Sequence, residues 1–147
     1  MAGDEYIINM KTIKFSELQV GTKGSYTKQI TREDVQKFID ICGDVNPIHV
    51  DDEFARGTPL KTKVVHGILV SGLISNVVGT KCPGPGSVWL DQTLKFLQPV
   101  IIGDTITETC EILVKIPARQ QVVVRTTCVN QSGEVVIEGV GLHKILL

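Results

Sequence analysis

Apolar residues recur at spacings of three and four between residues 31 and 42, as expected for one face of an α-helix. They are Val35, Phe38, Ile39 and Cys42. Thr31 precedes the stretch as a capping residue, with the acidic Asp34 three positions later. Gly43 follows it, and glycine is the usual residue just past a helix C-terminus. The pattern predicts an amphipathic helix that ends at Gly43.

A second helical stretch, over residues 67–79, has a different composition. Between Ile68 and Val78 its non-apolar residues are Ser71, Gly72, Ser75 and Asn76. A helix with this apolar composition is typically buried almost all round. Other elements therefore have to wrap around it.

The remaining segments alternate between apolar and polar residues, which is typical of β-strands. One such segment precedes the first helix, at residues 23–30, and four follow the second, at residues 87–100, 105–116, 121–129 and 134–146. In residues 87–100 the alternation places Val88 and Leu90 on one face and Trp89 and Asp91 on the other. Loops rich in glycine and proline separate the segments. This order predicts an α+β fold in which one antiparallel sheet curls around the apolar helix.

Composition narrows the class of protein. A chain of 147 residues with 42% hydrophobic and 21% charged residues fits one folded domain, which we place at residues 14–147 after a tail at 1–13. A net charge of −1 gives no reason to expect nucleic acid or an anionic membrane as a partner. The four cysteines show no C-x-x-C spacing, and we find no signal peptide. We therefore expect reduced thiols and a cytoplasmic location.

The candidate chemistry lies directly after the first helix, in the sequence Gly-Asp-Val-Asn-Pro-Ile-His at residues 43–49. Asp44 and His49 are side-chain types that commonly transfer protons. On an unbroken helix, residues five apart point about 140° away from each other. Pro47 disfavours the helical conformation at Asn46, so we expect a bent loop in which Asp44 and His49 can converge. Taken alone, these residues favour an ordinary turn in which Asp44 or Asn46 bonds to nearby backbone.

The same stretch resembles the motif of the MaoC-like hot dog proteins, in particular the (R)-specific enoyl-thioester hydratases. That motif runs from an aromatic residue through an aliphatic and a small residue to Gly-Asp-x-Asn-Pro-aliphatic-His, and ends at a small residue after five spacers. This chain supplies Phe38, Ile41, Cys42, residues 43–49 and Ala55. Residues 65–69, Val-His-Gly-Ile-Leu, are similar to the start of the family's central helix. The resemblance covers residues 14–147 and implies a hot dog fold, with a central helix at about 67–79 and an overhanging helix–loop segment at about 31–57.

The resemblance also implies an activity, the hydration of trans-2-enoyl thioesters to (R)-3-hydroxyacyl thioesters or the reverse dehydration. Asp44 and His49 would be the catalytic pair, and the backbone N–H of Gly67 would bind the thioester oxyanion. Ser75 would support the pair by hydrogen bonding, and Asn46 would fix the loop or the water. The substrate would be an acyl-CoA or acyl-carrier-protein thioester. No cofactor is implied, and members of the family typically form homodimers with a continuous sheet.

Simpler interpretations exist for several of these residues. Gly67 fits tight helix–sheet packing equally well, and a helical serine such as Ser75 more commonly bonds to the carbonyl one turn back. We interpret His66 as a structural hydrogen-bonding residue at the helix start and His143 as a surface side chain. The spacing of the three histidines is unlike that of metal ligands and argues against a metal site.

Two other functions remain open from the sequence. A hot dog thioesterase also needs an acidic residue and a helix N-terminus, although the Asp-x-Asn-Pro-x-His loop favours a hydratase. A non-catalytic acyl-thioester-binding domain is the other alternative. The intact Asp44 and His49 argue against it.

Overall fold

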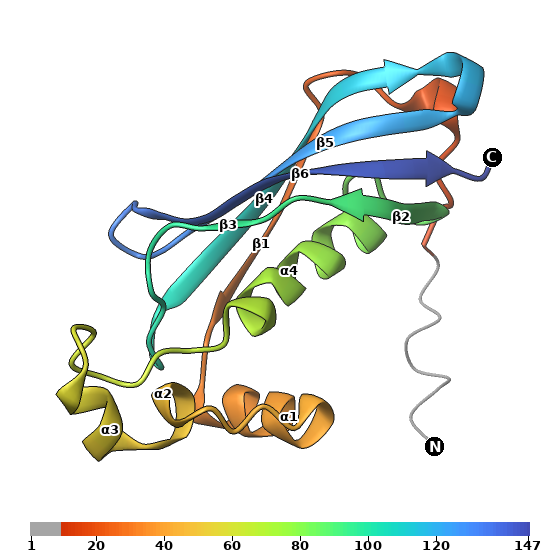
Figure 1. The fold of residues 1–147 in the computed structure, drawn as a ribbon. Coiled ribbons are helices and arrows are strands. Elements are labelled where there is room, and N and C mark those ends of the chain that lie inside the picture. Colours follow the sequence, from red (N-terminus) through yellow and green to blue (C-terminus); the bar gives the residue numbers. More distant parts are fainter. Residues whose placement is uncertain (1–9) are drawn as a thin grey trace.

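An antiparallel sheet of six strands forms the larger layer of the computed structural model, which describes residues 10–147 (Figure 1). Its strand order is β1-β4-β5-β6-β2, and the short β3 also pairs with β6. The strands are β1 (Lys23–Gln29), β2 (Ser87–Gln92), β3 (Lys95–Phe96), β4 (Thr105–Ile116), β5 (Gln121–Val129) and β6 (Val135–Ile145). The predicted tail lies outside the described residues up to position 9. Ile13 already belongs to the folded part, because its N–H donates to the Pro85 carbonyl at 2.9 Å.

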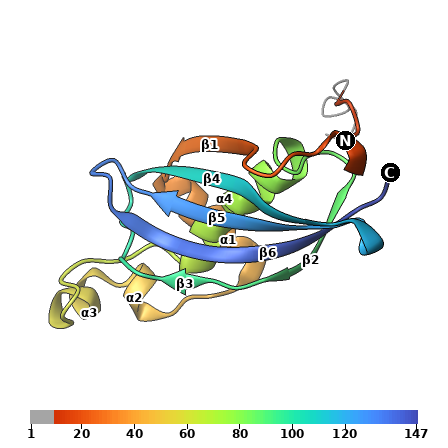
Figure 2. The same cartoon turned by 90° about the horizontal axis from the view of Figure 1, so that it is seen from above.

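Four α-helices complete the described fold: α1 (Arg32–Cys42), α2 (Pro47–Val50), α3 (Asp52–Gly57) and α4 (Gly67–Thr80). The 3-10 turns η1 (Phe15–Glu17) and η2 (Pro117–Arg119) accompany them. Helix α4 runs along one face of the sheet, while α1, α2 and α3 lie beyond its N-terminal end (Figures 1 and 2). This arrangement confirms the predicted hot dog fold, including the overhanging segment. Within residues 10–147, the helices are all too short or too polar to cross a membrane.

The core lies between α4 and the inner face of the sheet. From α4 it receives Val70, Leu73, Ile74, Val77 and Val78, and from the sheet, among others, Ile106, Ile112, Val122 and Val124. Burial of each such side chain stabilises the fold by about 1.5–3 kcal/mol relative to exposure. Thr31 and Asp34 form the expected capping box, which helps to hold α1 where the chain leaves β1.

The prediction that α4 is buried almost all round is wrong for the single chain. One side of the helix is open, and Ile68 there is 57% exposed. The other residues on this open face of α4 are Gly72, Ser75, Asn76 and Gly79. The sheet covers the opposite side only, and the open face carries a single large apolar side chain, that of Ile68.

Strand alternation was also misjudged in residues 87–100. A register shift between Trp89 and Asp91 in the pairing with β6 interrupts the two-residue alternation. Val88, Trp89 and Leu90 are all exposed, and the Trp89 ring lies 5.8 Å from the ring of His143, centroid to centroid, in a stacked arrangement. Because β2 is an edge strand with such an irregularity, a simple two-residue period does not assign its faces.

The interpretation of His143 as a surface residue is wrong. Its side chain is fully buried on β6, opposite Val122 of β5. Neither ring nitrogen has a hydrogen-bond partner among the described residues, and burial lowers the pKa of His143 to about 4. The ring is therefore neutral at physiological pH and acts as part of the core.

Glu108 is a second polar residue of the core, and the sequence reasoning missed it. It lies on β4 between the buried Ile106 and Cys110, which share its inward direction. The Cys110 thiol donates to one carboxyl oxygen at 3.0 Å, while the other oxygen has no partner within residues 10–147. Burial raises the pKa of Glu108 to about 7.

Glu108→Gln should stabilise the protein above neutral pH. Because the Glu108 pKa rises from 4.5 unfolded to about 7 folded, the contribution of Glu108 to stability is full below pH 4.5 and is lost as the pH rises through 7. The full loss is up to about 3 kcal/mol, and glutamine, which stays neutral, should avoid it. Urea unfolding at pH 4.5 and pH 8 measures this difference. Glu111→Gln, on the other face of β4, is the control and should give no such gain; an equal pH dependence in both variants would contradict the prediction.

Candidate active site

The loop after α1 owes its shape to two side chains that bond to the backbone. Gly43 ends α1 in the left-handed conformation, with φ 74°. The Asp44 carboxylate then accepts from the Asn46 N–H at 3.0 Å, and the Asn46 side chain accepts from the Ile48 N–H at 3.3 Å. The capped-turn interpretation is therefore correct for both residues. It does not exclude a catalytic role, because the second carboxylate oxygen of Asp44 takes no part in this turn.

The predicted loop is shorter than expected, because Pro47–Val50 forms the helical turn α2. Proline is well tolerated as the first residue of a helix, since its missing N–H would have no partner there. Asn46 caps this turn, and His49 lies within it. The turn directs His49 back toward the start of α4.

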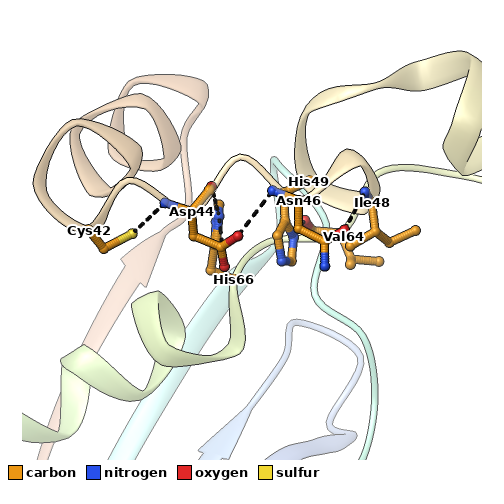
Figure 3. A network of polar contacts seen from close by, with 7 residues as sticks. All are labelled: Cys42, Asp44, Asn46, Ile48, His49, Val64 and His66. Atoms are coloured by element: carbon orange, nitrogen blue, oxygen red, sulfur yellow. Dashed lines mark hydrogen bonds and ion pairs between the residues drawn. The ribbon is translucent and has the colours of Figure 1, made fainter.

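Asp44, His49 and His66 come together between the overhang and α4 (Figure 3). One polar side-chain atom of each lies within 4.8 Å of those of the other two. The His49 and His66 rings stack with their centroids 3.8 Å apart. His66 Nε2 lies 3.0 Å from the Asp44 carbonyl oxygen and 3.9 Å from its carboxylate. Figure 3 shows this network joining the loop to the first turn of α4.

His49 is oriented so that one ring nitrogen remains available. Its Nδ1 lies 2.7 Å from the Val64 carbonyl oxygen, which can only accept, so Nδ1 carries the proton in this contact. In the neutral ring, Nε2 then has the lone pair. His49 also lines a cavity.

This cluster contains residue types that bind metals, which the sequence spacing did not reveal. A zinc ion has to lie near each ring plane, about 2.0–2.1 Å from the nitrogen. The His49 and His66 planes are only 27° apart at 3.8 Å, so their lone pairs do not converge at that distance. The arrangement suits proton transfer better than metal binding.

Gly67 borders the same cavity, whose volume is about 480 Å³. Apolar side chains form most of the wall, including Val65, Val70, Phe96 and Ile137. Gly67 is the first residue of α4, where backbone N–H groups lack a partner within the helix and the helix dipole favours negative charge. A Cβ on Gly67 would lie 2.6 Å from the Phe96 ring, so close packing also favours glycine there. Both interpretations of Gly67 therefore fit the structure.

Ser75 lies apart from this cluster within the chain. It is on the open face of α4, eight residues after Gly67, which corresponds to about 12 Å along a helix. No hydrogen bond among the described residues joins it to Asp44 or His49. Its supporting role stays a prediction. Ser71, by contrast, is buried and donates to the Ile68 carbonyl at 2.8 Å, as helical serines commonly do.

Comparison with known proteins places this geometry in a family. The sequence profile of the family described as "MaoC like domain" matches residues 15–133. The chain belongs to the MaoC-like family.

Its MaoC-like relatives match over nearly the whole chain. The (R)-specific enoyl-CoA hydratase of Rhodospirillum rubrum is 40% identical over 95% of this chain and 93% of its own length. The 3-hydroxybutyryl-CoA dehydratase of Methylorubrum extorquens is 41% identical over 92% of this chain and 86% of its own length. Among solved structures, the unliganded R-hydratase PhaJ1 of Pseudomonas aeruginosa is 39% identical, with a TM-score of 0.84 over 91% of this chain and 86% of that one. The resemblance drawn from residues 38–55 is thereby confirmed.

Proposed function

We propose that this MaoC-like protein hydrates trans-2-enoyl thioesters to (R)-3-hydroxyacyl thioesters and catalyses the reverse dehydration. The observation that carries the proposal is the meeting of Asp44 and His49 beside the apolar cavity that Gly67 borders. The similarity to proteins named (R)-specific enoyl-CoA hydratase and 3-hydroxybutyryl-CoA dehydratase supports the same reaction.

The reaction needs a proton acceptor, a proton donor and a site for negative charge. As the water oxygen bonds to C3, the catalytic pair takes a proton from the water, and the electrons of the C2=C3 bond move toward the thioester oxygen. The N–H of Gly67, at the positive end of α4, stabilises that oxygen. The pair then returns one proton to C2, so the enzyme ends each turnover in its starting state.

The lining of the cavity supports an acyl thioester as the substrate. Its mostly apolar lining favours a hydrocarbon chain, and His49 and Gly67 are polar positions where the reactive carbons and carbonyl would lie. Relatives act on CoA thioesters, and a mitochondrial relative of Arabidopsis thaliana is named a 3-hydroxyacyl-[acyl-carrier-protein] dehydratase. We propose acyl-CoA or acyl-carrier-protein thioesters as the substrates of this chain.

Crotonyl-CoA provides the direct test. The ultraviolet absorbance of its conjugated enoyl thioester should fall on addition of the protein, while a parallel thiol assay stays at background. Chiral analysis of the product should give the (R)-3-hydroxyacyl thioester. Thiol release would instead indicate a thioesterase. No change with enoyl-CoA substrates of several chain lengths would refute the hydratase proposal and favour an acyl-binding domain.

We propose that the protein is a homodimer, because the single chain leaves apolar side chains exposed on α4 and on the edge strand β2. The open face of α4 includes Ile68, and the adjoining edge strand β2 exposes Val88 and Leu90. A second copy pairing at this edge would cover these side chains and extend the sheet. Exposed strand edges of this kind are sites where another chain can add to a sheet.

Gly72→Glu should shift the protein from dimer to monomer. Gly72 lies on the open face of α4, with no atom within 4 Å of a Cβ built on it, so the single chain has room for a larger side chain. A buried, unpaired carboxylate in a dimer interface would be strongly unfavourable. Sedimentation at micromolar concentration measures the change, and Gly57→Glu on α3 is the control. A monomeric wild-type protein would contradict the dimer.

A further inference from the structure

His66 joins the catalytic loop to the start of α4. It is the residue immediately before α4, yet its side chain forms no capping bond to that helix. Its ring is instead directed toward the loop, where Nε2 meets the Asp44 carbonyl oxygen at 3.0 Å. The His66 side chain is only 3% exposed, whereas Asp44 is exposed, so this contact is partly buried.

The same ring determines how His49 can lie. The two imidazoles stack at 3.8 Å and 27°, and Phe38 of α1 contacts His66 at a centroid distance of 5.0 Å. His49 is thus held by its face against His66 and by Nδ1 against the Val64 carbonyl. Together these two contacts determine the direction of His49 Nε2.

His66 has no exposed polar atom with which to reach a substrate itself. The Asp44 carbonyl only accepts, so Nε2 of His66 carries the proton that it donates there. Nδ1 is buried and has no hydrogen-bond partner within residues 10–147. His66 also does not line the cavity, unlike its neighbour Gly67.

We propose that His66 is a positioning residue that aligns the two halves of the catalytic pair. It holds Asp44 through the main chain and His49 through the plane of its ring, from a fixed point at the beginning of α4. This inference rests on the proposed hydratase function. A displacement of about 1 Å between reacting groups can cost on the order of 10² in rate, which is why such alignment matters.

Two substitutions separate the contacts of His66. His66→Phe keeps a ring against His49 but removes the donor to Asp44, whereas His66→Gln keeps an N–H donor but removes the ring. Each should lower kcat for crotonyl-CoA about 10- to 100-fold, with KM changed less than about threefold, because neither removes a wall of the cavity. Ile112→Val, a core change outside the cavity lining, is the control for loss of stability and should leave kcat unchanged.

A double-substitution cycle tests whether His66 acts through its stacking partner. In a His49→Ala background, His66→Gln should lower kcat no further than about twofold, because the ring it orients is already absent. If His66→Gln lowered kcat by the same factor with and without the His49 side chain, the inference would be overturned. Wild-type kcat in both His66→Phe and His66→Gln would overturn it as well.

Nuclear magnetic resonance provides a readout that does not depend on activity. Stacking should shift the ring-proton resonances of His49, and the shift should disappear in His66→Gln and persist in part in His66→Phe. If the wild-type protein lacks hydratase activity but these shifts occur, the proposed function fails while the alignment by His66 stands. Unchanged His49 resonances in folded His66→Gln would refute the alignment itself.

Discussion

Asp44→Asn should lower the rate of crotonyl-CoA hydration by about 10² to 10⁴, the usual contribution of a positioned proton-transfer group. The amide cannot take up or deliver the proton that the reaction moves. The loop should keep its shape, because the asparagine oxygen can still accept the Asn46 N–H that Asp44 now accepts at 3.0 Å. Initial rates measure the loss of activity, and thermal unfolding of the same samples checks that the fold is kept.

Asp40→Asn is the matched control for this change. Asp40 lies on the exposed side of α1, where its carboxylate accepts from Gln36 at 2.9 Å, and it is not among the residues that line the cavity. It should retain full activity. A fully active Asp44→Asn protein would remove Asp44 from the mechanism and with it the main argument for a hydratase.

Gly67→Ala should lower the hydration rate by about 10² to 10³, the loss typical of one oxyanion donor. The added methyl group would lie in the space that a thioester oxygen needs in order to reach the N–H. It would also lie 2.6 Å from Phe96, so that ring has to move. Gly57→Ala on α3, where a Cβ meets no atom within 4 Å, is the control and should keep both rate and stability.

The double substitution Gly67→Ala with Phe96→Ala distinguishes the two interpretations of Gly67. Removal of the Phe96 ring relieves the overlap with the methyl group but not the obstruction of the N–H. If Gly67 serves the oxyanion, stability should recover while the rate stays low. Recovery of the rate as well would assign Gly67 to packing alone.

Much of the candidate site could be predicted because its signals are local. The capping box at Thr31, the end of α1 at Gly43 and the turn at Pro47 depend on residues within a few positions of one another. The helical turn at Pro47–Val50 was not predicted. Proline is nevertheless common as the first residue of a helix, and no helix-breaking residue follows it here. The position of Gly67 at the start of α4 was also correctly predicted.

The role of His66 could not be derived in the same way. Its contacts with Asp44 and His49 span 22 and 17 positions, and they depend on how the overhang folds back onto α4. The sequence offered one signal, a histidine directly before the predicted oxyanion glycine, which supported no more than a structural hydrogen bond. The hydrogen bond is present, but the stacking on His49 was not predictable.

Local patterns in the sequence determined the order of elements, the apolar helix, and the loop in which Asp44 and His49 lie near each other. These depend on backbone preferences and short-range periodicity, which neighbouring residues decide. Only the tertiary structure decided that His143 and Glu108 are buried, that one face of α4 is open, and that His66 stacks on His49. The physical reason is that burial depends on which strands pair and where a register shift falls, and no single segment carries that information.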